Sequence, residues 1–121
     1  MTFAEFLAWQ WSDYPVKHRS RVNLAIHIVA VPLFMLGCAA VAVGILRVVP
    51  FRIVSGFVAM IVSVLLEGIG HRFESERPAP FASFGDFVKR FFVEQWVTFP
   101  RFVLSGRYFL NLADPSRPDH G

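Results

Sequence analysis

A short polar segment, EGIGHRFESERPAP, follows an apolar run and carries side chains that can do chemistry. Glu67 and His71 are four residues apart, and His71 and Glu74 are three apart, so a continuing helix presents all three on one face. Upstream, Asn23 and His27 are also four residues apart, at the start of another apolar run. Ionisable groups next to segments of membrane length are candidates for a functional site.

Three histidines and a carboxylate predict a metal site if the fold brings them together. The candidate ligands, which would also be the catalytic residues, are His18, His27, His71 and Glu74. Imidazole with carboxylate suits iron(II) or zinc, and two histidines with one carboxylate, leaving open positions, are typical of non-haem iron oxygenases. Such a site can bind O₂ together with a chelating 2-hydroxy acid. Two neighbours are expected to orient the ligands without binding the metal: Asn23 and Glu67.

Each candidate also has a purely structural interpretation, which the sequence leaves open. His27 can be a buried histidine bonded to Asn23 or to a backbone carbonyl. His18 can contact lipid headgroups, and His71 can cap a helix, because a protonated imidazole is favoured at a helix C-terminus. Glu74 can pair with neighbouring arginines in water. The metal interpretation therefore depends on the convergence of these residues in space.

Two long apolar segments must position these side chains. Residues 22–46 carry no formal charge and make a helix of about 37 Å, which is enough to span a bilayer. Residues 53–70 form the second segment, and the short connector between them contains Pro50, so an antiparallel hairpin is predicted. In such a hairpin the start of the first helix meets the end of the second, which brings His27 and His71 near one membrane face.

A break in the chain is needed for His18 to join the other histidines. On one unbroken helix, a separation of nine residues would place His18 and His27 on opposite faces. Ser20 is a good N-cap residue, and a break there lets His18 fold back. We expect Pro15 to end a preceding amphipathic helix that starts with a capping box at Thr2. This helix would lie at the bilayer interface or cover the other helices from the aqueous side.

The C-terminal third predicts two further helices. Residues 84–99 form an amphipathic helix with an aromatic face, capped by Ser83. The opposite face is expected to carry the charged residues Asp86, Lys89, Arg90 and Glu94. Pro100 should interrupt this helix, and residues 101–112 form a shorter apolar helix that re-enters the membrane or lies on it. Residues 113–121 are polar and rich in proline, and we predict that they are disordered.

The composition favours a membrane protein. Of the 121 residues, 55% are apolar and 17% are charged, and fourteen Phe with three Trp exceed what a small soluble core needs. We therefore predict an all-α fold with one domain over residues 1–112. It would be a small integral-membrane helical bundle built on an antiparallel transmembrane hairpin, with flanking amphipathic helices.

The distribution of charge argues against nucleic acid as a partner. The net charge is +3, and the basic residues are spread along the chain without a Lys/Arg-rich block. Basic residues beside apolar runs fit contacts with anionic lipid headgroups. The flanks counted are Lys17, Arg19, Arg21, Arg72 and Arg77 at the open end of the hairpin, against Arg47 and Arg52 at the connector. By the positive-inside rule, both termini and the His/Glu cluster lie on the cytoplasmic side of a bacterial inner membrane.

Two segments carry a resemblance to a known family. YPVKHRSRVNLAIHIVAVP (14–32) and GIGHRFESERPAP (68–80) resemble the 2-hydroxy fatty acid dioxygenases, small multi-helix membrane proteins of the fungal endoplasmic reticulum and of bacteria. The matching positions are His18, Asn23, His27, Pro32, Gly70, His71, Phe73, Glu74, Pro78 and Ala79. The chain departs from the family pattern at Ala30, which is usually Gly, and at Glu67, which is often an amide.

The resemblance implies an iron(II) enzyme of fatty acid α-oxidation that uses O₂ to shorten a 2-hydroxy fatty acid by one carbon. It assigns the metal to three histidines and favours Glu74 as their carboxylate partner. Judged by position, Lys17, Arg19 or Arg72 would hold the substrate carboxylate.

The leading hypothesis is therefore an Fe(2+) dioxygenase that takes its lipid substrate from the bilayer. Two alternatives stay open. One is an electron-transfer or sensing protein in which His27 and His71 are the axial ligands of a haem. The other is a non-catalytic membrane scaffold whose polar residues only join helices.

Overall fold

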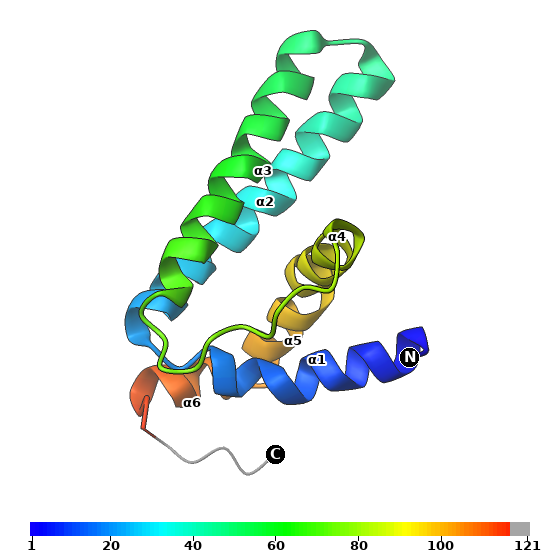
Figure 1. Cartoon of the computed structure of the whole chain (residues 1–121). Coiled ribbons are helices and arrows are strands. Elements are labelled where there is room, and N and C mark those ends of the chain that lie inside the picture. Colours follow the sequence, from blue (N-terminus) through cyan, green and yellow to red (C-terminus); the bar gives the residue numbers. More distant parts are fainter. Residues whose placement is uncertain (117–121) are drawn as a thin grey trace.

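The computed structural model describes residues 1–116, and every regular element in this part of the chain is a helix (Figure 1). The elements follow in the order α1 (Phe3–Lys17), α2 (Arg21–Arg47), α3 (Pro50–His71), α4 (Phe84–Val93), a π-helical turn η1 (Glu94–Thr98), α5 (Phe99–Leu104) and α6 (Arg107–Ala113). The predicted all-α class is confirmed. Of the tail predicted to be disordered, 113–121, Ala113 ends α6 and residues 117–121 lie outside the described residues.

Helices α2 and α3 form the antiparallel hairpin expected from the two apolar segments (Figure 1). Their backbones approach closely at Gly37 and Gly56, where a Cβ on either residue would lie 2.7 Å from the carbonyl oxygen of the other. Small residues are what permit such close helix contact. The connector is shorter than predicted, because Pro50 already belongs to the first turn of α3, where its missing N–H costs no hydrogen bond.

The surface of this hairpin suits a lipid environment. Both α2 and α3 are long and apolar enough to cross a membrane, by length and composition. In their most apolar stretches, 28% of the residues of α2 and 22% of those of α3 are buried inside the protein. Most of their apolar side chains therefore face outward.

The chain breaks between α1 and α2 as predicted, although α1 runs slightly further than expected. Pro15 lies in the last turn of α1 and does not end the helix, which continues to Lys17. The carbonyl of Pro15 accepts hydrogen bonds from the backbone N–H of His18 and from the side chain of Asn111. Ser20 then caps α2 by accepting from the backbone N–H of Asn23.

A small aromatic core joins α1, α5 and α6 to the first half of α2. Its buried members are Tyr14, Leu24, Val31, Phe99, Phe102 and Tyr108. The Tyr108 hydroxyl donates to the carbonyl of Leu24, and Arg21 donates to the last carbonyls of α6. Residues 101–112, for which we expected a helix re-entering or lying on the membrane, are thus two short helices packed against the open end of the hairpin.

Pro100 does not interrupt the C-terminal helical run, because the turn before it widens. In η1 the backbone N–H of Phe99 bonds to the carbonyl of Glu94, five residues earlier. A regular α-helical turn would bring the Pro100 ring against the carbonyl four residues before it, and a π-helical turn relieves this clash. Such turns occur often at functional sites.

Candidate metal centre

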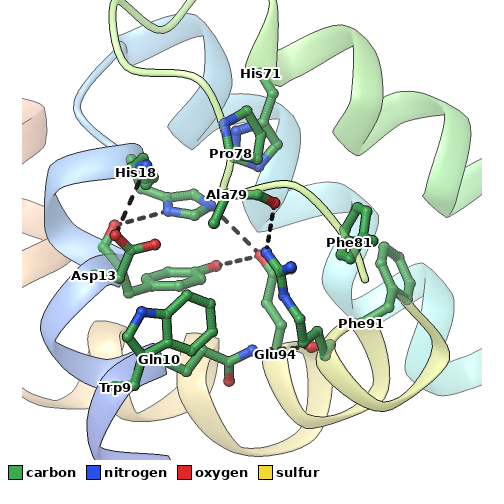
Figure 2. Close-up of a pocket in the computed structure, with 13 residues that line it drawn as sticks. Trp9, Gln10, Asp13, His18, His71, Pro78, Ala79, Phe81, Phe91 and Glu94 are labelled. Carbon is green, nitrogen blue, oxygen red and sulfur yellow. Dashed lines mark hydrogen bonds and ion pairs between the residues drawn. The ribbon is translucent and has the colours of Figure 1, made fainter. Parts of the chain in front are cut away.

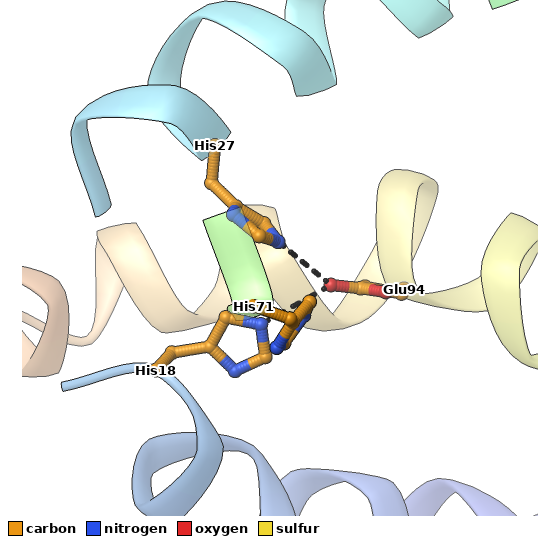
Figure 3. Close-up of side chains that lie close together, drawn as sticks. All are labelled: His18, His27, His71 and Glu94. Atoms are coloured by element: carbon orange, nitrogen blue, oxygen red, sulfur yellow. Dashed lines mark ion pairs between the residues drawn. The ribbon is translucent and has the colours of Figure 1, made fainter. Parts of the chain in front are cut away.

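Four side chains from separate elements meet near the open end of the hairpin (Figure 3). They are His18 from the break after α1, His27 from α2, His71 from the end of α3 and Glu94 from η1. One potential ligand atom from each lies within 4.8 Å of those of all the others. The imidazole centroids are 4.7–5.2 Å apart and the rings are nearly perpendicular to one another. The predicted convergence of the three histidines is therefore present.

Backbone carbonyls fix the tautomers of two of these histidines. Nδ1 of His18 lies 2.8 Å from the carbonyl oxygen of Tyr14, and Nδ1 of His27 lies 3.0 Å from that of Asn23. A carbonyl can only accept, so both Nδ1 atoms carry the proton and both Nε2 atoms are left with a lone pair in the neutral ring. This pattern is typical of metal-binding histidines.

The inward nitrogens lack ordinary hydrogen-bond partners. Within the described residues, His18 Nε2, His27 Nε2 and His71 Nδ1 are buried and accept or donate no hydrogen bond. Buried polar atoms are normally satisfied, so a group of three such nitrogens needs an explanation. Nε2 of His27 also faces carboxylate oxygens of Glu67 at 3.1 Å and Glu94 at 3.4 Å. A cation, either a proton or a metal ion, is required between such lone pairs.

Glu94 brings a negative charge into the cluster. Its Oε2 lies 3.4 Å from Nε2 of both His18 and His27, and it accepts a hydrogen bond of 2.8 Å from the Tyr14 hydroxyl. Burial would raise the pKa of the Glu94 carboxyl, but the contacts with the two histidines outweigh it and hold that pKa well below its usual value. Glu94 is therefore a carboxylate.

Tyr14 contacts both Glu94 and His18, because its hydroxyl donates to Glu94 and its ring stacks on His18 with the centroids 3.7 Å apart. Burial, and then the neighbouring Glu94, raise the pKa of the Tyr14 hydroxyl, which stays protonated as a donor. Burial also lowers the pKa of His18, with Glu94 opposing the effect, which favours the neutral imidazole that metals bind.

Glu74, the carboxylate that the sequence favoured, lies elsewhere. Its oxygens accept from the backbone N–H groups of Arg19 and Ser20 at 2.9–3.1 Å and from the side chain of Asn23 at 2.7 Å. The expected i, i+3 pairing with His71 does not form because α3 ends at His71. Glu74 instead ties the loop after α3 to the start of α2, where a carboxylate is favoured by the helix dipole.

The two predicted neighbours of the ligands are both close to them. Asn23 supplies the carbonyl that orients His27, and its amide is the donor to Glu74. A Cβ on Gly70 would collide with the amide oxygen of Asn23, so a larger residue there would force this side chain to move. Glu67 is buried, faces His27 and accepts from Gln95 at 2.9 Å.

The three basic residues predicted to bind the substrate carboxylate lie at different places around the cluster. Lys17 borders the cluster and donates to the carbonyl of Arg77 at 2.7 Å. Arg72 follows His71 directly and lines a neighbouring cavity of about 580 Å³, together with Arg77. Arg19 contributes its backbone N–H to Glu74.

A cavity of about 80 Å³ opens onto the cluster (Figure 2). His18, His71 and Glu94 form one part of its wall, and the loop segment 78–81 forms another. Arg90 holds this segment by donating to the carbonyls of Ala79 and Pro80, each at 2.9 Å. The cavity therefore has a polar end at the cluster and a loop covering it.

Sequence reasoning missed Glu94, which we expected on the solvent-facing side of the amphipathic helix. Its neighbours held a signal: Gln95 and Thr98 are polar residues within an otherwise aromatic helix face, and both are buried beside the cluster. A polar patch at one end of an apolar face indicates a buried polar partner.

Comparison with protein families matches residues 3–102 to the family described as 2-hydroxy-palmitic acid dioxygenase Mpo1-like. No curated protein and no solved structure matches the chain. The matched range contains all four residues of the cluster and both segments that carry the resemblance. The chain therefore belongs to the Mpo1-like family of 2-hydroxy-palmitic acid dioxygenases.

Proposed function

We propose that the protein is an iron(II)-dependent dioxygenase that shortens 2-hydroxy fatty acids by one carbon. The observation that carries this proposal is the group of three inward, unpartnered imidazole nitrogens beside one carboxylate, in a chain of this family. Imidazole with carboxylate suits iron(II), and a site that leaves coordination positions open can accept a chelating substrate and O₂.

The proposed ligands are His18 Nε2, His27 Nε2, His71 Nδ1 and a carboxylate oxygen of Glu94. Glu94 replaces Glu74 in this set because the oxygens of Glu74 are occupied by donors at the start of α2. Bound iron(II) would supply the chemistry that makes O₂ reactive toward the chelated 2-hydroxy acid. The reaction balances without an added reductant: the 2-hydroxy acid and O₂ give the acid shortened by one carbon, CO₂ and water.

The surrounding residues keep the ligands in place. The carbonyls of Tyr14 and Asn23 hold the His18 and His27 rings in the tautomer that turns Nε2 inward. The Tyr14 hydroxyl restrains the Glu94 oxygen that faces both rings. Glu67, which accepts a hydrogen bond from Gln95, lies 3.1 Å from Nε2 of His27 and so adds a second negative charge beside the inward nitrogen of that ring.

The substrate carboxylate would also be held by basic residues at the edge of the cluster, which leaves one of its oxygens to face the ligands. We favour Arg72, because the cavity that it lines shares His71 with the cluster cavity. Lys17 is close enough to assist from the cluster cavity itself. The hydroxyl and carboxylate would then reach the metal while the tail points back toward the hairpin.

We further propose that α2 and α3 span the bilayer and that the cluster lies near its cytoplasmic face. Their length, apolar composition and outward-facing side chains support this arrangement. The excess of basic residues at the open end of the hairpin gives the orientation. Substrate would then reach the site from the membrane.

The test is to load the purified protein with iron(II) under anaerobic conditions, add 2-hydroxypalmitate and O₂, and measure the products by mass spectrometry. We expect pentadecanoic acid and CO₂ in equal amounts. Failure to bind iron, or binding without any such product, would reject the proposal.

We do not favour the haem alternative. The His27 and His71 rings are nearly perpendicular, with their centroids 5.2 Å apart. The ring centroid of His18 lies 4.8 Å from that of His27 and 4.7 Å from that of His71. A macrocycle between them would have to displace His18. An absorption spectrum of the purified protein checks this point, because a haem protein has a strong Soret band.

A further inference from the structure

A third cavity, separate from the cluster, lies between the hairpin and α4. It has a volume of about 260 Å³ and is lined by apolar side chains from α2, α3 and α4. Its lining includes Phe34, Phe57, Met60, Val64, Phe87 and Phe91. Its lining offers no polar atom to a ligand, so this space favours an apolar occupant.

Along the two hairpin helices, this apolar cavity begins at the same distance from the cluster: Phe34 is seven residues from His27, and Val64 is seven residues from His71. On α4 its lining comes closer to the cluster, because Phe91 is three residues from Glu94. Seven helical residues correspond to about 10 Å. The far end of the cavity, at Phe57, is fourteen residues from His71, or about 21 Å along α3.

Two contacts join the apolar cavity to the cluster cavity. Phe91 lines both cavities, and it borders the cluster cavity together with Phe81 (Figure 2). The rings of Phe81 and Phe87 are 5.0 Å apart, and those of Phe34 and Phe91 are 5.1 Å apart. One aromatic wall therefore runs from the polar end at Glu94 into the apolar cavity.

The outer side of this cavity faces the surroundings of the hairpin. Phe57 is 48% exposed and Phe84, at the first turn of α4, is 80% exposed. Helix α4 stands beside the hairpin over this region (Figure 1). An acyl chain from a bilayer around the hairpin could thus enter sideways between α3 and α4.

We infer that this cavity holds the acyl tail of the 2-hydroxy fatty acid and sets the chain length that the enzyme prefers. This inference rests on the proposed function. A head group chelated at the cluster places the first methylenes against Phe91, and the following ones against Phe34, Val64 and Phe87. The methyl end of a long chain lies near Met60 and Phe57.

A chain-length series tests the inference with the whole iron-loaded protein. Val64→Phe fills the near end of the cavity, so kcat/KM for 2-hydroxypalmitate should fall at least about tenfold, the scale of a misfit of one methylene or more in an apolar pocket. Activity on 2-hydroxyhexanoate, whose tail is too short to pass Val64, should change little. Phe57→Ala opens the far end, so the ratio of kcat/KM for chains of 20 carbons to that for 16 carbons should rise several-fold.

Val58→Phe is the matched control, because Val58 lies on α3, is 54% exposed and does not line the cavity. Its chain-length profile should equal that of the unaltered protein. If Val64→Phe and Phe57→Ala also leave the profile unchanged while turnover continues, the inference is wrong and the proposed function stands.

A binding measurement keeps the inference testable without turnover. A 2-hydroxypalmitate analogue with a diazirine at its methyl end, photolysed with the protein in lipid nanodiscs, should label residues 57–61 and 84–88. Unlabelled 2-hydroxypalmitate should compete. If 2-hydroxypalmitate competes with the labelling but the protein never turns this acid over, the proposed function is rejected while the inferred acyl-tail site is supported. Equal labelling of these residues by a diazirine-tagged phospholipid would show a bilayer lipid as the occupant and overturn the inference.

Discussion

The α2–α3 hairpin and the α4–η1–α5 arm contribute to the same cluster in different ways. The hairpin is apolar, and its backbones touch at Gly37 and Gly56, so van der Waals packing holds His27 and His71 opposite each other. The arm also packs through aromatic residues, but its links to the cluster are polar contacts, such as those of Glu94 with Tyr14 and of Gln95 with Glu67. The hairpin thus supplies rigid imidazoles, and the arm supplies the charge.

This difference has a consequence for mutants. Changes in the hairpin backbone should lower stability, whereas changes to polar groups of the arm should weaken metal binding in a protein that still folds. Iron content and thermal unfolding, measured on the same variants, separate these two effects.

The largest effect is expected for His71→Ala, at the end of the hairpin. Removing this imidazole should abolish iron binding and product formation. This loss is greater than the decrease of about 10- to 100-fold in metal affinity or activity that is typical when a residue that only orients a ligand is removed. Iron content after anaerobic loading measures it, with circular dichroism to establish that the helices remain. Retained iron and full activity in a folded variant would remove His71 from the site.

The next effect distinguishes the two candidate carboxylates. Glu94→Gln should lose iron while its helices stay folded, because the amide still fits beside Tyr14 but supplies no charge. Glu74→Gln should keep iron and lose about 1.5–3 kcal/mol of stability, since its hydrogen bonds to Arg19, Ser20 and Asn23 are no longer to a charged group. The reverse pattern, with iron lost only in Glu74→Gln, would return the ligand role to Glu74.

A smaller effect is expected for Tyr14→Phe, which keeps the ring stacked on His18 and removes the hydroxyl that bonds to Glu94. Iron affinity should fall by about 10- to 100-fold, as for other groups that orient a metal ligand. A competitive titration with a ferrous chelator measures this change. An unaltered affinity would mean that Glu94 does not need the hydroxyl to hold its position.

The smallest effect on the site is expected in the hairpin itself. Gly56→Ala places a methyl group against the Gly37 carbonyl and should destabilise the protein by about 1–3 kcal/mol, without changing the number of iron ions bound. Thermal unfolding in detergent measures the loss. Gly68→Ala is the control, because a Cβ there meets nothing within 4 Å, and alanine should stabilise the helix by up to about 1 kcal/mol.

The hairpin and three of the four cluster residues follow from the sequence alone. Apolar runs of membrane length separated by a short connector leave few arrangements other than an antiparallel pair. The break at Ser20 explains how His18 turns back, because an N-cap residue starts α2 there. These features depend on local pattern, which a single sequence records well.

The carboxylate could not be assigned in the same way. Helical spacing favoured Glu74, but α3 ends at His71, and helix ends are poorly specified by pattern. Glu94 enters the cluster because η1 widens the turn before Pro100 and because α1 packs against the arm, where Gln10 donates to the carbonyl of Arg90. Both depend on contacts between residues far apart in the chain.

X-ray absorption at the iron edge of the anaerobically loaded protein tests the metal centre most directly. The account predicts one iron(II) per chain, with the multiple-scattering pattern of three imidazoles, and an iron-edge signal that is lost in Glu94→Gln because this variant does not keep the metal. An iron ion that shows no imidazole scattering, or an undiminished iron-edge signal in Glu94→Gln, would contradict it.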